Sequence, residues 1–258
     1  MSIKNVIVVG FPKSGTTWAS RLIAELIQCP LRGDWGYKDI DCPYKEGLER
    51  DSQFQCYKSH HTYDEINTVS PLTIYKIIYI IRDPRDIVLS GINYFSFSIP
   101  QLAFLKNKKT QTIERFTRKI INRFLPKKEK KKQMINTVLQ GDESINYWFK
   151  VSWEKHHKNY LSKDILFVRY EDLLDFGETE CTKIMSYLDI ETTQEHIYNS
   201  IKKQSFKKRK QEILNQRNHP LKKLIRKGSY GYWKEEFTKD ETYLFKKNIK
   251  DSNHFYEF

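Results

Sequence analysis

Residues 5–18 read NVIVVGFPKSGTTW, and this stretch decides the fold. An apolar run ends at Gly10 and gives way to small, hydrogen-bonding residues, and from Trp18 onward apolar residues recur at helical spacing. The pattern predicts a strand, a tight loop and a helix that begins at Thr17. A glycine-rich turn at a helix start directs backbone N–H groups and the positive end of the helix dipole to one spot. The loop is therefore expected to bind a phosphate group.

The loop differs at one position from the loop that binds ATP and GTP, which reads Gly-x-x-x-x-Gly-Lys-Ser/Thr. Gly10 and Gly15 keep the spacing, but Thr16 stands where the lysine that reaches the β- and γ-phosphates is required. The loop's own lysine is Lys13, which precedes the second glycine. This arrangement favours a nucleotide whose 5′ end is not a triphosphate. A P-loop kinase for a small molecule and a glycine turn without a ligand are the alternatives.

Length and composition favour one domain over residues 1–258, because there is no Pro/Gly/Ser-rich linker and no internal repeat. The four cysteines lack the spacing of a metal site, and we expect free thiols and no metal. We see no signal peptide, and the longest apolar run is too short to span a bilayer. We therefore predict a cytoplasmic protein without a membrane partner.

A net charge of +13 points to anionic partners, and much of it lies between Lys106 and Lys132. We favour a solvated, mobile insertion for this segment, because the aromatic residues that stack on bases are sparse there. On this interpretation the protein binds no nucleic acid. A polyanion-binding protein that uses the same lysines is the alternative.

Short β-branched or aromatic runs alternate with helical patterns along the chain. The predicted strands are Val6–Val9, Cys56–Ser59, Ile74–Ile81 and Ile165–Tyr170. The predicted helices are Thr17–Gln28, Pro84–Phe95, Ile145–Tyr160, Glu178–Leu188 and Thr193–Ser205. This order predicts an α/β fold, with a central, mostly parallel sheet covered by helices on both faces. Such sheets bind ligands beyond the carboxyl ends of their strands, where Lys13, His60 and Arg82 follow three of the predicted strands.

Two further segments suit phosphate binding. Arg82 follows a buried strand and Ser90 lies on the next helix, so a guanidinium and a hydroxyl are available for a second phosphate. Near the C-terminus, Arg226-Lys227-Gly228 offers two cations and a residue that lets the backbone approach closely. The alternatives are an ordinary ion pair between Arg82 and Asp86, and a basic surface turn.

Taken together, these segments resemble the signature of the sulfotransferases that use 3′-phosphoadenosine 5′-phosphosulfate (PAPS) and release 3′-phosphoadenosine 5′-phosphate (PAP). The likeness runs in order along nearly the whole chain and is strongest to the soluble small-molecule branch. The residues that match donor-binding positions are Lys13, Ser14, Gly15, Thr16, Thr17, Trp18, Arg82, Ser90, Tyr170, Phe206, Arg226, Lys227 and Gly228. The likeness implies a P-loop-like nucleotide-binding core and PAPS as the donor.

The resemblance also implies catalytic roles. His60 in Lys58-Ser59-His60 matches the family's catalytic base, and imidazole titrates near neutrality. Lys13 would stabilise the leaving group, and Ser90 would bind the 3′-phosphate and restrain Lys13. His61 is the rival base. The chain departs from the family's Gly-Asp-Trp at residues 231–233 and matches poorly over residues 96–140.

The acceptor is expected to be a small molecule, through a hydroxyl or an amine. By resemblance the segment from Arg32 to Tyr44 borders the acceptor pocket, and it holds Asp34, Trp35, Tyr37, Asp39, Asp41 and Tyr44. Carboxylates beside aromatic faces suit a cation, so a polar or cationic natural product is our hypothesis, with a solvated acidic loop as its alternative. The oligomeric state is expected to be monomer or homodimer.

Overall fold

The computed structural model describes residues 3–37, 42, 44–97, 124–161, 163–215, 222, 228–250 and 255–258. These residues group into two compact units. The first comprises Met1–Arg82 and His156–Tyr230, and the second comprises Asp83–Lys155 and Gly231–Phe258. A single domain over the whole chain stays a prediction. Within the described residues, no helix is both long enough and apolar enough to cross a membrane.

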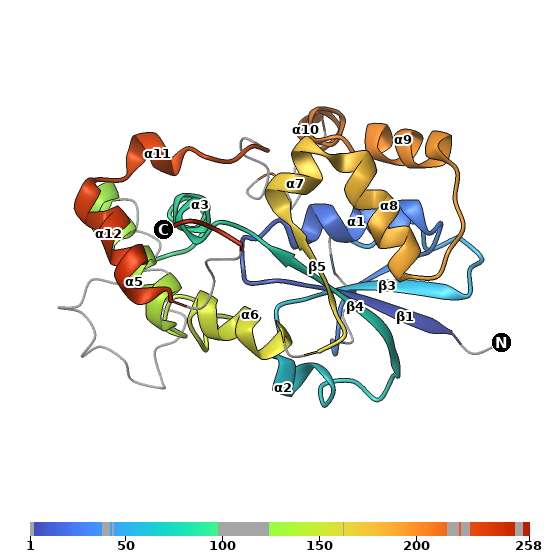
Figure 1. The fold of residues 1–258 in the computed structure, drawn as a ribbon, viewed down its shortest axis with the longest axis horizontal. Coiled ribbons are helices and arrows are strands. Elements are labelled where there is room, and N and C mark those ends of the chain that lie inside the picture. Colours follow the sequence, from blue (N-terminus) through green and yellow to red (C-terminus); the bar gives the residue numbers. More distant parts are fainter. Residues whose placement is uncertain are drawn as a thin grey trace. The chain divides into compact units, whose positions relative to one another are not determined.

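A five-stranded parallel sheet forms the centre of the first unit (Figure 1). Its strands are β1 (Lys4–Val9), β2 (Leu31–Asp34), β3 (Phe54–Ser59), β4 (Ile74–Ile81) and β5 (Leu166–Arg169). The order across the sheet is β2-β3-β1-β4-β5, so β1 lies between β3 and β4. Because all neighbours are parallel, the carboxyl ends of the strands share one edge, which is where ligands bind in such sheets.

Helices lie on both faces of this sheet (Figure 1). The helices of the first unit are α1 (Thr16–Leu26), α2 (Tyr63–Ile66), α7 (Tyr170–Asp175), α8 (Gly177–Tyr187), α9 (Gln194–Lys203) and α10 (Phe206–Asn215). On one face, Val8 and Ile80 of the sheet share a buried cluster with Leu22 of α1, Ile184 of α8 and Ile197 of α9. Each such side chain contributes roughly 1.5–3 kcal/mol when fully buried.

The opposite face is aromatic. Tyr79 of β4 stacks on Phe167 of β5 with a centroid separation of 4.9 Å. The Tyr79 ring also packs against His156 and Tyr160, at 5.8 and 5.0 Å. Both residues belong to α6 (Trp153–Leu161), which begins in the second unit and ends in the first. Burial on both faces explains why β4 reads as a nearly continuous apolar run.

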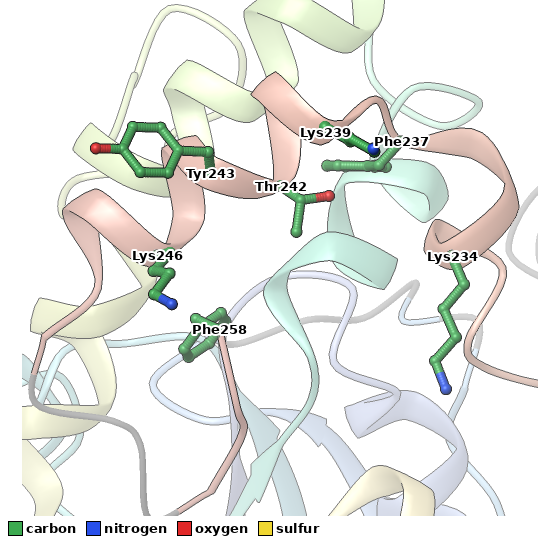
Figure 2. A pocket seen from close by; sticks show the side chains of 7 residues that line it. All are labelled: Lys234, Phe237, Lys239, Thr242, Tyr243, Lys246 and Phe258. Carbon is green, nitrogen blue, oxygen red and sulfur yellow. The ribbon is translucent and has the colours of Figure 1, made fainter.

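The second unit is helical where it is described, with α3 (Pro84–Gly91), α5 (Lys127–Gln140), α11 (Trp233–Glu236) and α12 (Lys239–Asn248). Arg85 of α3 lies 3.6 Å from the Trp233 ring centroid and 4.9 Å from that of Phe258. A pocket of about 390 Å³ also lies here (Figure 2). It is lined by Lys234, Phe237, Lys239, Thr242, Tyr243, Lys246 and Phe258. None of these is a predicted catalytic or donor-binding residue.

The α/β prediction with a parallel sheet and flanking helices is confirmed, but several elements differ from it. Strand β2 was not predicted, and neither were the helices α2, α5, α7, α10, α11 and α12. The helix predicted over Ile145–Tyr160 is wrong in its first half, since α6 begins only at Trp153. Before it, the side chains of Asp142 and Asn146 accept hydrogen bonds from backbone N–H groups two positions further on. These bonds hold local turns that compete with a helix.

The basic segment Lys106–Lys132 is described only from residue 124 onward. Residues 127–132 form the first turns of α5, where Lys131 donates to the Glu241 carboxylate at 2.7 Å and to the Glu236 carbonyl at 2.8 Å. Lys127 pairs with the Glu236 carboxylate at 2.7 Å. Residues 127–132 are therefore helical, and two of their lysines bond to α11 and α12. Residues 106–123 of the predicted mobile insertion lie outside the described residues.

Candidate active site

The loop between β1 and α1 folds tightly at the carboxyl edge of the sheet. A Cβ on Gly10 would lie 2.6 Å from the Ile80 carbonyl oxygen, so only glycine fits beside β4. The Ser14 N–H donates to the Phe11 carbonyl at 3.0 Å and closes a turn. Lys13 has a φ of 74°, a left-handed conformation uncommon for a residue with a side chain. The loop thus turns the chain back toward the start of α1.

The start of α1 is suited to an anion. Gly15 is the N-cap with a φ of 89°, no side chain caps the helix, and its first turn carries no acidic residue. The first N–H groups of a helix have no intrahelical partner and lie at the positive end of its dipole. In the described part of the chain, the fully buried Ser14 hydroxyl has no hydrogen-bond partner. A phosphate or sulfate group at this turn would satisfy both the N–H groups and the hydroxyl.

Two aromatic side chains that match donor-binding positions meet beside this loop. A Cβ on Gly15 would lie 2.5 Å from the Tyr170 ring, which therefore covers the glycine. Trp18 meets the same ring edge-on with a centroid separation of 5.8 Å. Its indole N–H donates to the Gln204 carbonyl at 2.8 Å. Both rings are thus held next to the anion-binding turn.

Arg82 joins three segments of the site. Its guanidinium donates to the carbonyl oxygens of Lys13 and Ser229, each at 3.2 Å. It also lies 4.4 Å from the Tyr170 ring centroid, a cation–π contact. The Asp86 carboxylate, the alternative partner considered for this arginine, accepts from the Gly231 N–H within the second unit. Arg82 therefore fixes the backbone of the loop as well as supplying charge.

The C-terminal donor segment is only partly described. Gly228 has a φ of 65°, and a Cβ on it would overlap the Phe206 ring, which packs directly on its backbone. These two predicted donor-binding residues are therefore in contact. Arg226 and Lys227 lie outside the described residues. Ser90 lies on α3 in the second unit, where it is partly exposed.

His60 is the first residue after β3. Its Nδ1 lies 2.7 Å from the Gly10 carbonyl oxygen. A carbonyl can only accept, so Nδ1 carries the proton and Nε2 carries the lone pair. Burial lowers the pKa of His60 well below its ordinary value, and the charge of Lys58 adds to this effect. At neutral pH the imidazole is therefore unprotonated at Nε2, the state that a general base requires.

His61, the rival base, is in a different setting. Its side chain is buried, and its Nδ1 lies 2.9 Å from the Ser59 hydroxyl. Its ring stacks on Tyr37 with a centroid separation of 6.0 Å. Its carbonyl accepts from the Tyr160 hydroxyl at 2.8 Å. These contacts favour a structural role for His61.

The segment predicted to border the acceptor holds an ion pair. Lys58 Nζ lies 3.1 Å from the Asp34 carboxylate and donates to the Tyr44 hydroxyl at 2.9 Å. Tyr44 in turn donates to Asp34 at 2.5 Å. Trp35 is buried and donates its indole N–H to the Ile66 carbonyl, whereas Tyr37 is 49% exposed. Asp39 and Asp41 lie outside the described residues.

Sequence reasoning missed two residues that support His60. His156 lies 3.2 Å through Nε2 from the His60 carbonyl oxygen, and its Nδ1 lies 2.7 Å from the Tyr79 hydroxyl. Tyr79 lies inside a predicted apolar strand, and His156 lies far along the chain in a stretch without a motif. The sequence signal that could have found this pair was the Tyr79 hydroxyl, which lies within a buried run of isoleucines and needs a hydrogen-bond partner there.

The sequence is similar to known sulfotransferases over most of its length. A family model described as "Sulfotransferase domain" matches residues 4–255. Rat (Rattus norvegicus) sulfotransferase 1A1 is 22% identical, over 91% of this chain and 79% of its own. An amine sulfotransferase from Oryctolagus cuniculus is 24% identical, over 96% of this chain and 81% of its own.

Solved structures share the fold. Mouse sulfotransferase SULT7A1 complexed with PAP superposes with a TM-score of 0.66 at 23% identity, covering 97% of this chain and 86% of the mouse chain. Retinol dehydratase in complex with androsterone and PAP gives 0.58 at 18% identity, covering 97% and 82% of the two chains. Because the family model spans nearly the whole sequence, the chain belongs to the sulfotransferase family.

Proposed function

We propose that this protein transfers a sulfuryl group from PAPS to a hydroxyl or amine of a small molecule. Membership of the sulfotransferase family supports the reaction class. The mouse and retinol dehydratase structures hold PAP, which is what remains of PAPS after transfer. The observation that carries the donor assignment is the buried, unpartnered Ser14 hydroxyl in the described anion-binding turn.

The residues of the turn fit a 5′-phosphosulfate. Ser14, Gly15, Thr16 and Thr17 would hold it through hydroxyl and N–H groups at the positive end of α1. Trp18, Tyr170 and Phe206 would contact the adenine, and Arg82, Ser90, Arg226, Lys227 and Gly228 would hold the 3′-phosphate. When bound, PAPS supplies the sulfuryl group and departs as PAP.

His60 is the proposed general base. Its Nε2 takes the proton of the acceptor group as the acceptor oxygen or nitrogen bonds to sulfur and the bond from sulfur to the phosphate oxygen breaks. The bond from Nδ1 to the Gly10 carbonyl holds the ring in the tautomer that this step needs. A positioned base of this kind contributes typically about 10²–10⁴-fold to the rate.

Lys13 is the proposed cation for the leaving phosphate oxygen. Its backbone carbonyl is held by Arg82, so the start of the side chain is fixed at the mouth of the turn. A cation placed beforehand where negative charge develops stabilises the transition state more than it does in water. The restraint of Lys13 by Ser90 is carried over from the resemblance.

The acceptor class has less support. Of the residues that suggested a cationic acceptor, Asp34 is neutralised by Lys58 and Trp35 lies in the core. Among the described residues of this segment, the Tyr37 ring, which is 49% exposed, supports a cation–π contact. A cationic acceptor, a cytoplasmic location and a monomeric or homodimeric state are carried forward as predictions. An acceptor panel in which only neutral phenols or lipids react would contradict the first of these.

A transfer assay with sulfur-labelled PAPS and a panel of phenols, alcohols and amines tests the proposal. We expect labelled product with at least one acceptor, and no phosphorylated product from Mg²⁺-ATP. His60→Ala should abolish turnover while PAP binding, measured by calorimetry, stays at the wild-type value. Phosphoryl transfer without sulfuryl transfer would contradict the donor assignment. Near-wild-type turnover by His60→Ala would contradict the choice of base.

A further inference from the structure

A buried chain of hydrogen bonds lies behind His60. The Tyr79 hydroxyl lies 2.7 Å from Nδ1 of His156, and Nε2 of His156 lies 3.2 Å from the His60 carbonyl oxygen. That carbonyl can only accept, so Nε2 of His156 donates to it. The other nitrogen, Nδ1, then has the lone pair and accepts from Tyr79. The direction of every bond in the chain is therefore fixed.

Burial keeps this arrangement in one state. The His156 side chain is fully buried, and burial lowers its pKa to about 4. Tyr79 is also buried, and burial raises the pKa of its hydroxyl well above the ordinary value. At neutral pH both groups are therefore neutral. His156 presents an N–H donor to the His60 carbonyl throughout the range in which a general base works.

The position of His60 explains why such support matters. The register pairs of β1 and β3 end at Val9 and Ser59, so His60 lies just beyond the carboxyl end of the paired strand. Its carbonyl is held by His156 from α6, and its Nδ1 is held by the Gly10 carbonyl in the turn after β1. Two bonds from different elements thus set the backbone and the ring of the same residue.

We infer that His156 and Tyr79 are positioning residues for His60. His156 fixes the His60 peptide, so that the His60 ring meets the Gly10 carbonyl through Nδ1 and presents Nε2 to the acceptor. Tyr79 selects the His156 tautomer that donates to the His60 carbonyl. The inference rests on the proposed role of His60 as the base. Neither residue touches a substrate in it, and both act through the geometry of His60.

The test compares four single variants, and the double variant Tyr79→Phe/His156→Phe, in the full-length protein. His156→Phe keeps the bulk of the ring and removes both bonds, whereas His156→Gln keeps an amide that can donate and accept. Tyr79→Phe removes only the hydroxyl. Tyr187→Phe is the matched control, because the Tyr187 hydroxyl also bonds to β4, at the Ile77 carbonyl, 3.1 Å away.

The expected results separate positioning from stability. A displacement of about 1 Å in a catalytic group costs up to about 10²-fold, so His156→Phe should lower kcat about 10- to 100-fold with KM for PAPS unchanged. Tyr79→Phe should lower kcat less, and the double variant should be no worse than His156→Phe, since the two act as one unit. His156→Gln should recover most of the loss, and Tyr187→Phe should keep kcat.

Nitrogen-15 NMR of the His60 imidazole gives a readout that does not depend on turnover. The wild type should show a single tautomer with the proton on Nδ1, and His156→Phe should show a mixture of tautomers. His60→Ala is measured in parallel. If His60→Ala loses activity while His156→Phe keeps both kcat and the single tautomer, the positioning role is refuted and the base assignment stands. If His60→Ala stays active, the base assignment itself fails.

Discussion

Replacing Gly15 with alanine perturbs the anion-binding turn at its tightest point. Gly15 has a φ of +89°, and a Cβ there would lie 2.5 and 2.6 Å from two carbons of the Tyr170 ring. The left-handed backbone costs a residue with a Cβ roughly 1–2 kcal/mol. Forcing a methyl group into a packed site costs typically about 1–3 kcal/mol more. We therefore expect Gly15→Ala to lower the free energy of unfolding by about 2–5 kcal/mol.

Gly231→Ala is the matched control for backbone strain. Gly231 has a φ of +84°, and within the described part of the chain a Cβ there would meet nothing within 4 Å. Gly231→Ala should lower the free energy of unfolding only by the cost of the left-handed backbone, about 1–2 kcal/mol.

Gly15→Ala should also weaken PAP binding, because Tyr170 must leave the loop to make room for the methyl group.

Urea unfolding and calorimetry with PAP measure the two effects. For a chain of this size the loss at Gly15 corresponds to a fall in melting temperature of roughly 5–15 °C. A Gly15→Ala protein that is no less stable than Gly231→Ala and binds PAP like the wild type would refute the packing of Tyr170 on the turn.

Three other outcomes follow from the same contacts. Arg82→Ala removes a cation that bridges the Lys13 and Ser229 carbonyls. Because each bond to a charged group contributes about 1.5–3 kcal/mol, PAP affinity measured by calorimetry should fall about tenfold or more. Unchanged affinity would exclude a role of Arg82 in donor binding. Trp18→Phe removes the bond to the Gln204 carbonyl and should cost about 1 kcal/mol in urea unfolding, whereas an unchanged midpoint would show that the bond contributes nothing. Burial lowers the pKa values of both His60 and His156, so below about pH 6.5 the unfolded state binds more protons than the folded state. The stability that these two groups contribute is therefore present above that pH, and it is lost as the pH falls toward the pKa values of the folded state. Unfolding at pH 5 and 7.5 measures this, and equal stability at both would contradict the neutral state of the two rings.

The sheet was largely predictable because its strands carry strong local signals. The mainly apolar runs that became β1 and β4 are largely buried, so the sequence alone marks them. Strand β2 carries no such signal, since Leu31–Asp34 reads Leu-Arg-Gly-Asp and Gly33 has a φ of 114°. It pairs with β3 at the edge of the sheet, so tertiary contact overrides a weak local preference.

The turn of the candidate site was predictable for a similar reason. Gly10, Gly15 and the small polar residues between them are adjacent in sequence, and the turn they form is local. The support behind His60 is different, because the Tyr79 and His156 contact joins residues 77 positions apart. Such a contact has no local pattern and becomes visible only when β4 and α6 are placed together.

The same distinction applies to Lys58 and Asp34. Each was recognised separately, the lysine in a catalytic motif and the aspartate on an acceptor-bordering segment. Their pairing at 3.1 Å follows from the parallel alignment of β2 with β3, which was not predicted. A charge pattern along the chain shows which charged groups are present, but it does not show which of them form ion pairs with one another.

Thermal unfolding with and without PAP tests the central claim most directly, with Mg²⁺-ATP as the control. A ligand present at about a hundredfold excess over its Kd adds roughly 2.7 kcal/mol to the free energy of unfolding. For a chain of this length, that corresponds to a rise in melting temperature of roughly 5–10 °C. The account predicts this rise with PAP and little change with Mg²⁺-ATP. No rise with PAP, or a larger rise with Mg²⁺-ATP, would contradict the assignment of the turn to a phosphosulfate donor.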